Sequence, residues 1–160
     1  MNKASRVLMF GVLAIALSSC ASKPPVQPKP SPQPPRAETG RVEVTVKGFK
    51  SEEGRALIAL FLSDSGWPQD KTLAFAALQL PIQDLQVVAV FEAVPAGPIA
   101  ISVFHDKNGN GELDTGPFGI PSESYGFSRD ARDTLGPPKF AQARLELAAG
   151  QSMSIVIHVE

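Results

Sequence analysis

Apolar and polar residues begin to alternate at residue 41, and they alternate again at the end of the chain. A period of two places every second side chain on one face of a β-strand, so each stretch predicts a strand with one buried and one wet face. The inward positions are Val42, Val44 and Val46 in the first stretch and Met153, Ile155, Ile157 and Val159 in the last. Together with what lies between them, these strands define the predicted folded domain, residues 41–160.

Five further stretches between these two strands are apolar enough to form regular structure. Residues 55–63 are nearly all apolar, which favours a central strand buried on both faces or a short helix, and residues 73–80 are ambiguous between strand and helix. Strands are predicted over the other three, which are residues 86–92, 98–105 and 140–147. The turns between strands fall at Gly54 and at residues 95–97 and 149–151.

About seven short strands, joined by Gly and Pro turns and without a strong amphipathic helix, predict an all-β fold. The expected architecture is an immunoglobulin-like or transthyretin-like β-sandwich. The only cysteine is Cys20, so the Cys–Trp–Cys pattern of antibody domains is absent and no internal disulfide can form. The 120 residues from 41 to 160 are enough to bury a core that is stable without one.

The amino terminus has the pattern of an export signal. Lys3 and Arg6 precede an apolar run of 11 residues, 7–17, which is shorter than the about 20 residues that a transmembrane helix needs. Residues 17–20, Leu-Ser-Ser-Cys, resemble the lipobox of bacterial lipoproteins, in which the cysteine thiol is acylated and the signal peptide, here residues 1–19, is removed. The resemblance implies that acyl chains such as palmitate on Cys20 anchor the protein stably to a membrane.

Ala21 follows the cysteine. In enteric-type lipoproteins an aspartate at this place marks retention in the inner membrane, so the resemblance implies the outer membrane, facing the periplasm. Residues 20–40 form a predicted linker, because seven of the 20 residues 21–40 are proline, which disfavours both helix and sheet. We expect a disordered spacer of roughly 60 Å when fully extended. The alternatives are a ligand for a proline-binding partner and a stalk that spans peptidoglycan.

The charge of the chain excludes one class of partner. There are 15 basic and 16 acidic side chains, and removal of Lys3 and Arg6 with the signal peptide changes the net charge from −1 to −3. Without a basic field, nucleic acid is not an expected partner. The expected partners are the membrane, through the lipid anchor, and an envelope protein or glycan. A mixed-charge stretch, which contains Arg129, Asp130, Arg132 and Asp133, is expected to be solvated.

Residues 105–139 are rich in Gly, Pro and Asp and show no periodicity, and loops of such length in compact domains are usually functional. Within them, residues 106–114 follow the pattern D-x-N-x-N-G-x-x-D, which resembles the calcium loop of an EF-hand. Calcium takes six to eight oxygen ligands, and Gly111 permits the sharp turn that brings alternate residues to one ion. The candidate ligands are the side chains of Asp106, Asn108, Asn110 and Asp114 and the backbone carbonyl of Glu112.

Two departures separate this stretch from an EF-hand. Pro117 stands where the bidentate glutamate would be, and the flanking residues do not have a helical pattern. Glu123 is the candidate for the missing carboxylate. The alternative is that the Asn-Gly and Asp residues only form turns, since these residues favour positive φ and side-chain-to-backbone hydrogen bonds. The sequence makes calcium a candidate cofactor and leaves both interpretations open.

Three motifs stand in order around this loop: HDKNGNG at 105–111, GIPSESYGFS at 119–128 and GPPKF at 136–140. Together they resemble the bacterial family known as domain of unknown function 2141, and the resemblance covers about residues 41–160. Members of that family are small secreted or envelope proteins with no established activity. The resemblance implies an envelope location and a β fold, and it assigns no mechanism.

The aromatic residues of the long loop allow two arrangements. We expect Phe118, Tyr125, Phe127 and Phe140 to pack into a small core of the loop's own. In the alternative, Tyr125 and Phe127 lie exposed as a ligand-binding platform. Trp67, in a separate loop, is expected to plug the core, and the alternative there is an exposed aromatic side chain that binds sugar.

No catalytic set is visible in the sequence. The G-x-S-x-G, H-E-x-x-H and phosphate-binding glycine patterns are missing, and Cys20 is committed to lipid. His158 is expected to be solvated, and His105 to hydrogen-bond backbone of the loop at the end of its strand. The sequence therefore predicts a non-enzymatic envelope module that binds a partner or ligand. The alternatives are a structural spacer of the cell wall and a hydrolase or sugar-acting enzyme that uses Asp106, Asp114, Glu123 and His105.

Overall fold

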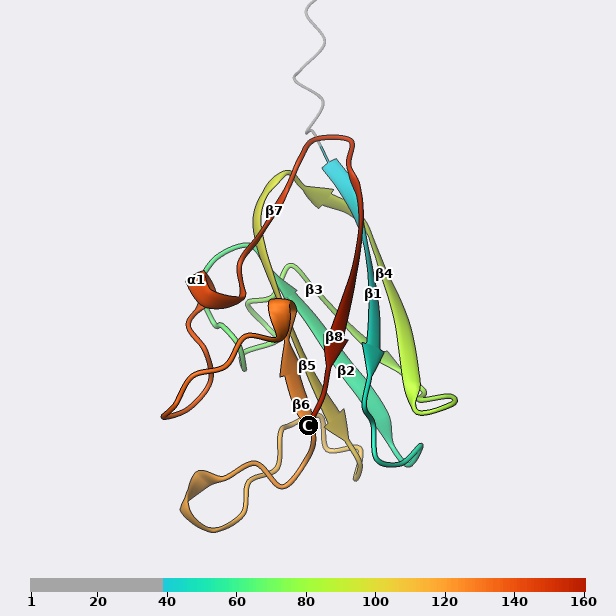
Figure 1. Cartoon of the computed structure of the whole chain (residues 1–160), viewed down its shortest axis with the longest axis vertical. Helices are drawn as coiled ribbons and strands as arrows, with labels where there is room; N and C mark the ends of the chain where they lie inside the picture. Colours follow the sequence, from blue (N-terminus) through green and yellow to red (C-terminus); the bar gives the residue numbers. More distant parts are fainter. Residues whose placement is uncertain (1–38) are drawn as a thin grey trace, which may run out of the picture. The chain divides into compact units, whose positions relative to one another are not determined.

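The computed structural model describes residues 39–160, which form two β-sheets packed face to face (Figure 1). One sheet has the strand order β4-β1-β8, and the larger one has the order β3-β2-β5-β6 with β7 paired to β5. The strands are β1 (Thr39–Lys47), β2 (Arg55–Phe61), β3 (Ala76–Leu80), β4 (Gln86–Pro95), β5 (Gly97–Asp106), β6 (Tyr125–Phe127), β7 (Leu145–Leu147) and β8 (Ser152–His158). The helical elements are the 3₁₀ turns η1 (Pro117–Gly119) and η2 (Ser128–Asp130) and the single turn α1 (Phe140–Ala143). The predicted all-β sandwich is confirmed with eight strands, and the immunoglobulin-like topology stays a prediction.

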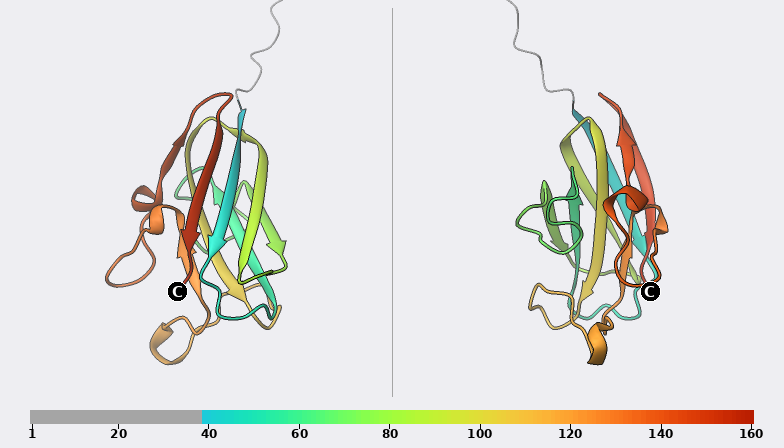
Figure 2. Two further views of the ribbon diagram at one scale, coloured as in Figure 1. Left: turned by 45° about the vertical axis from the view of Figure 1, so that its right-hand side comes forward. Right: turned by 90° about the vertical axis from the view of Figure 1, so that its left-hand side faces the viewer.

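The three-stranded sheet follows the alternating pattern of the sequence. β1 lies antiparallel to β4 and parallel to β8, and Val44 is the register partner of both Ala89 and Ile155. The three strands lie side by side in the left-hand view of Figure 2. Every second residue of β1 is buried and its neighbours are at least partly exposed, as alternation requires. Both terminal strands are therefore confirmed.

The larger sheet is covered on both faces. Ile58 of β2 belongs to the core between the sheets, whereas Phe61 faces the other side, under Trp67 and Phe140. A strand buried on both faces has a continuous apolar sequence rather than an alternating one. The central-strand interpretation of residues 55–63 is confirmed over β2, and the ambiguous residues 73–80 end in the edge strand β3.

The strand predicted over residues 140–147 is wrong in its first half, because α1 occupies that place and only β7 is a strand. Phe140 and Ala143 are three residues apart, the spacing of one helical face, and this face packs on the outer side of the larger sheet. The Gln142 side chain accepts a hydrogen bond from the Lys139 amide at 2.5 Å and caps the turn.

Thr39 and the long loop lie at opposite ends of the sandwich. Thr39 pairs with Pro95, next to the start of β5, whereas the long loop leaves from the last residue of β5, Asp106. The predicted signal peptide, the acylation site Cys20 and the linker up to residue 38 lie outside the described residues. Among residues 39–160, no helix has the length and apolar character needed to span a bilayer.

Candidate functional site in the long loop

The first turn of the long loop is organised around Asp106. This carboxylate is 1% exposed, and its two oxygens accept hydrogen bonds from the amides of Gly109 at 2.8 Å and Gly111 at 2.9 Å. Both glycines have a φ of 77°, a conformation that side chains disfavour. The sharp turn that the sequence predicts at Gly111 is therefore present, and the Asp106 carboxylate holds it in place.

The other predicted ligand side chains converge on Asp114. Its two carboxylate oxygens accept hydrogen bonds from Nδ2 of Asn108 at 2.6 Å and of Asn110 at 2.9 Å. The Oδ1 atoms of these asparagines accept the amides of Asn110 at 3.0 Å and Glu112 at 2.8 Å. Asn108, Asn110 and Asp114 thus form one cluster, while Glu112 enters it through its backbone and has an exposed side chain.

Glu123 joins this cluster from the far side of the loop. Its side chain is 7% exposed, and its oxygens accept the amides of Lys107 at 2.8 Å and Asp114 at 3.0 Å. Glu123, the candidate for the missing carboxylate, therefore accepts hydrogen bonds from amides near both ends of the 106–114 stretch.

These carboxylates have no basic partner among residues 39–160. Within residues 39–160, none of the ion pairs includes Asp106, Asp114 or Glu123. The described part of the chain also holds no ready-made group of three His, Cys, Asp or Glu side chains arranged to hold a metal. The asparagine amides present nitrogen rather than oxygen to Asp114. A cation would require both side chains to reorient, because turning their amides over in place would set each Nδ2 against the backbone amide of Asn110 or Glu112 that Oδ1 now accepts.

A groove of about 530 Å³ lies on the outer face of the larger sheet, beside this loop. Its apolar lining includes Pro68, Phe104, Leu113, Pro121, Tyr125, Phe127 and Pro137. Lys71 lies in the β2–β3 connection, which lines one side of the groove. Its ammonium donates a hydrogen bond to the Gly111 carbonyl at 2.6 Å and so links this connection to the long loop. The sequence does not indicate that Phe104 lies at the base of a groove or that Lys71 contacts Gly111. Both features depend on which loops fold over the sheet.

The two aromatic residues nominated as an exposed platform have different surroundings. Tyr125 is half-buried and Phe127 is only 5% exposed, so Phe127 follows the expectation of a packed aromatic core and the alternative in which both lie exposed does not hold for it. Phe127 is buried because Trp67 and Phe140 close over it. Both Tyr125 and Phe127 still line the groove, and whether they bind a ligand stays a prediction.

Trp67 is half-buried and packs against the buried side chains on the outer face of the larger sheet, in line with the predicted packing role. Its ring lies 5.5 Å from that of Phe61, 5.7 Å from that of Phe127 and 5.9 Å from that of Phe140, between centroids. Its indole nitrogen donates to the Pro138 carbonyl at 2.8 Å. Aromatic edges and faces in this arrangement attract one another beyond the burial of apolar area. Trp67 therefore fastens the end of the long loop to the sheet.

Phe118 does not join this core, and its predicted place in a small core of the loop is wrong. It is 101% exposed. The Gly116 amide donates to the Ile120 carbonyl at 2.7 Å, which closes a tight turn, and Phe118 has a left-handed φ of 66° at its tip. Closing the turn directs the Phe118 side chain away from the sheet.

Ser128 is a structural residue of the site that sequence reasoning missed. It is fully buried, and its hydroxyl accepts the Ile101 amide at 3.0 Å and donates to the Ala143 carbonyl at 2.6 Å. It therefore links β5, η2 and α1. The residues next to Ser128 give no indication that it links three elements. The only sequence feature that distinguishes this serine is its place at the end of the GIPSESYGFS motif.

The two histidines have structural contacts. His105 is buried, its Nε2 lies 2.7 Å from the Glu53 carbonyl oxygen, and its ring meets Phe49 edge-on at 5.4 Å. The predicted backbone contact is confirmed, although Glu53 belongs to the β1–β2 connection rather than to the long loop. His105 and Glu123 also line a smaller cavity of about 290 Å³.

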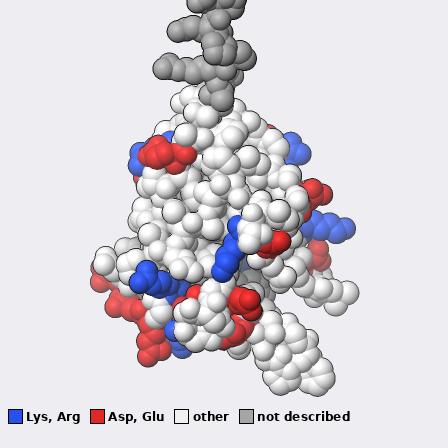
Figure 3. All heavy atoms as spheres, turned by 180° about the vertical axis from the view of Figure 1, so that it is seen from behind, with Lys and Arg blue, Asp and Glu red and all other residues white. Residues whose placement is uncertain are grey.

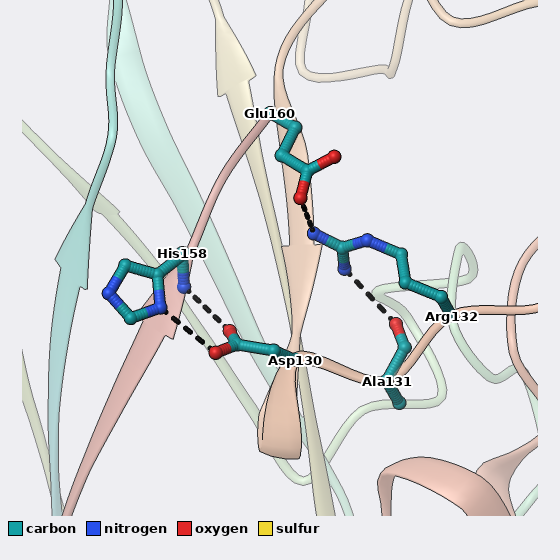
Figure 4. A network of polar contacts seen from close by, with 5 residues as sticks. All are labelled: Asp130, Ala131, Arg132, His158 and Glu160. Carbon is teal, nitrogen blue, oxygen red and sulfur yellow. Dashed lines mark hydrogen bonds and ion pairs between the residues drawn. The ribbon is translucent and has the colours of Figure 1, made fainter.

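His158 is exposed, as predicted, but it is paired with Asp130 rather than only solvated (Figure 4). Asp130 accepts hydrogen bonds from the His158 amide and from its Nδ1, both at 2.9 Å, and Arg132 pairs with Glu160 at 3.0 Å. Burial raises the pKa of Asp130, but the bonds and charge of His158 and the charge of Arg132 outweigh it and hold the pKa below its usual range. Asp130 of the mixed-charge stretch therefore links η2 to β8 through its hydrogen bonds from His158.

Comparison with known proteins places the whole site in one family. The family described as "Uncharacterized protein conserved in bacteria (DUF2141)" matches residues 44–155. The chain belongs to this family. The DUF2141 match includes the 106–114 loop, Glu123 and the groove lining. No curated protein matches the chain, and no solved structure does.

Proposed function

We propose that this DUF2141 chain is a lipid-anchored, non-catalytic binding module of the bacterial cell envelope. The observation that carries the proposal is the apolar groove of about 530 Å³, built on a rigid sheet and walled by the long loop. Concave, mostly apolar surfaces of 300–1,000 Å³ are typical of ligand and partner sites. The groove is the proposed binding surface, presented by a sandwich of immunoglobulin-like architecture.

Calcium is the proposed cofactor of the groove wall. Asp106 and Asp114 end the 106–114 stretch and Glu123 bonds it from outside, and within residues 39–160 the buried carboxylates of Asp106 and Glu123 have only backbone amides as hydrogen-bond partners. Burying a charge is costly unless an opposite charge or a metal compensates it. If the two asparagine side chains reorient and give up their bonds to the amides of Asn110 and Glu112, oxygen atoms of Asp106, Asn108, Asn110, Glu112, Asp114 and Glu123 would supply six hard ligands, which suits Ca²⁺.

Calcium should therefore raise the melting temperature of the protein. At a concentration ten times its dissociation constant, it should stabilise the fold by about 1.4 kcal/mol. Thermal unfolding followed by circular dichroism, with and without millimolar CaCl₂, measures this effect. Asp114→Asn, which removes one ligand charge with little change of shape, should reduce the shift.

Glu112→Gln is the matched control, because Glu112 is expected to bind through its carbonyl oxygen and its side chain is exposed. This variant should retain the calcium shift of the natural chain. An unchanged melting curve at millimolar calcium, or an equal shift in Asp114→Asn, would reject the metal site and favour metal-free turns.

The hydrolase alternative has weaker support. The carboxylates of Asp106 and Glu123 each accept hydrogen bonds from two backbone amides, which hold both side chains in fixed positions. His105 is held between the Glu53 carbonyl and the Phe49 ring. These contacts favour a structural role for the residues that such an enzyme would use.

The anchor rests on residues 17–20, which precede the described part of the chain. Cells fed labelled palmitate should incorporate the label into this protein, and Cys20→Ser should abolish incorporation because the chain has no other cysteine. The acylated protein should fractionate with the outer membrane. Label retained in Cys20→Ser would show that the lipid is elsewhere, and no label in the natural chain would refute the anchor.

A further inference from the structure

Both asparagines that lie among residues 39–160 precede a glycine, in the dipeptides Asn108-Gly109 and Asn110-Gly111. Hydrolysis of an asparagine side chain is fastest before glycine, because glycine has no Cβ to hinder the approach of its backbone nitrogen to that side chain. Both asparagine side chains are exposed to water. The 106–114 turn thus carries two side chains that are prone to lose ammonia.

The reaction has two steps. The glycine nitrogen attacks Cγ of the asparagine, the bond between Cγ and Nδ2 breaks, and the proton of the glycine N–H leaves with Nδ2 as ammonia. Water then opens the cyclic imide at either of its two carbonyl carbons and leaves aspartate or isoaspartate. An amide and a water molecule are thereby converted into a carboxylate and ammonium.

Asp106 holds the attacking nitrogen of both reactions. The Gly109 amide donates to its Oδ1 at 2.8 Å, and the Gly111 amide donates to its Oδ2 at 2.9 Å. Each N–H must break a charge-assisted hydrogen bond to a buried carboxylate before its nitrogen is free to attack. One side chain therefore restrains both nucleophiles.

Asp114 holds the leaving group of both reactions. Its carboxylate accepts Nδ2 of Asn108 at 2.6 Å and Nδ2 of Asn110 at 2.9 Å. The Oδ1 atoms of the two asparagines are fixed as well, because they accept the amides of Asn110 and Glu112. The nucleophile, the leaving group and the side-chain oxygen are therefore all hydrogen-bonded within the closed turn.

We propose that Asn108 and Asn110 form a hydrolytic modification site that Asp106 and Asp114 keep closed. The site becomes reactive when the turn opens locally, because opening releases the glycine N–H groups and the side-chain amides together. Residues 115–122, which follow the turn, have no charged side chain and project as the lobe at the lower right of Figure 3. Exposed segments of this kind open at a lower free energy than core strands. The inference needs neither a ligand nor a metal, so it goes beyond the proposed function.

Modification makes the opening one-way. Aspartate in place of Asn110 has no N–H to donate to Asp114 and sets a second negative charge against it. Isoaspartate routes the backbone through its side chain, which moves the Gly111 amide out of register with Asp106. Gly111 also lines the groove, and its carbonyl accepts the Lys71 ammonium at 2.6 Å. The expected result is a groove wall that stays loosened.

The test follows both asparagines by peptide mass spectrometry while the full chain is incubated in EDTA at neutral pH. The folded chain should be modified about tenfold more slowly, or more slowly still, than the same chain unfolded in guanidinium chloride. Asp114→Ala should raise the folded rate at both positions toward the unfolded rate. Glu112→Ala, the matched control with an exposed side chain in the same turn, should leave it unchanged. EDTA keeps the outcome independent of the proposed calcium site.

Gly150→Ala tests whether the opening is local. It strains a turn beside Thr39, at the other end of the sandwich, and should leave both rates unchanged well below the melting temperature. Equal rates in the folded and unfolded chains, no acceleration in Asp114→Ala, or equal acceleration in Gly150→Ala would each overturn the proposal.

Trypsin tests whether the opening is one-way. The modified chain, separated from the natural chain by its added negative charge, should be cleaved after the exposed Lys107 about tenfold faster, because cleavage tracks the population of the open turn. Equal cleavage of the two forms would show that the modified turn closes again and would refute the loosened wall.

Discussion

Replacing Trp67 with alanine should lower the free energy of unfolding by about 3 kcal/mol, the lower end of the range for large aromatic residues because Trp67 is half-buried. The ring contacts Phe61, Phe127 and Phe140, which come from three separate parts of the chain. Its removal leaves a cavity between the sheet and the end of the long loop. Urea denaturation followed by far-ultraviolet circular dichroism measures the loss.

Trp67→Phe is the matched control for this experiment. It keeps an aromatic ring in the cavity but loses the hydrogen bond to the Pro138 carbonyl, which contributes about 1 kcal/mol. The phenylalanine variant should therefore lie between the natural chain and the alanine variant. A loss below 1 kcal/mol in Trp67→Ala would contradict the packing role of this side chain.

Replacing Gly54 with alanine should lower the free energy of unfolding by about 2–5 kcal/mol. Gly54 turns the chain into β2 with a φ of 71°, a conformation that costs other residues about 1–2 kcal/mol. A Cβ at this position would also lie 2.1 Å from the Asp106 carbonyl oxygen. That oxygen belongs to the backbone at the start of the long loop, so it cannot move aside without disturbing the turn, and overpacking of this kind costs about 1–3 kcal/mol more.

Gly150→Ala separates the two causes. Gly150 has nearly the same φ, 70°, and a Cβ there would meet nothing within 4 Å. Its alanine variant should lose only the conformational cost of about 1–2 kcal/mol. The difference between the two variants in urea midpoint then measures the close approach to Asp106. Equal losses would mean that the β1–β2 connection and the long loop can separate freely.

These two residues show how the sandwich supports the proposed site. Trp67 fastens the end of the long loop to the outer face of the larger sheet, and Gly54 lets the β1–β2 connection pack against its beginning. The loop between these fixed ends forms the groove wall and the Phe118 tip. A surface built in this way keeps its form before a partner arrives, which reduces the entropy lost on binding.

Local patterns were sufficient to predict much of this protein. Alternation at Val42, Val44 and Val46 determined β1 and its buried face, because a period of two is a property of the extended backbone itself. The continuous apolar run determined β2. The turn around Gly111 and the carboxylate at its start also followed from the sequence, since Asp106 bonds amides only three and five residues away.

Contacts between distant segments decided the rest. Ser128 binds Ile101, 27 residues away, and Ala143, 15 residues away, and nothing adjacent to it in the chain indicates either bond. Phe118 and Phe127 are both phenylalanines in one loop, yet one is fully exposed and the other buried. Burial depends on which other segments close over a side chain, and that is settled only when the sheets, Trp67 and α1 have packed. The sequence alone thus determined most of the strands and the turn around Gly111, whereas β6, α1, the groove, its floor and the exposed tip depend on packing in the folded domain.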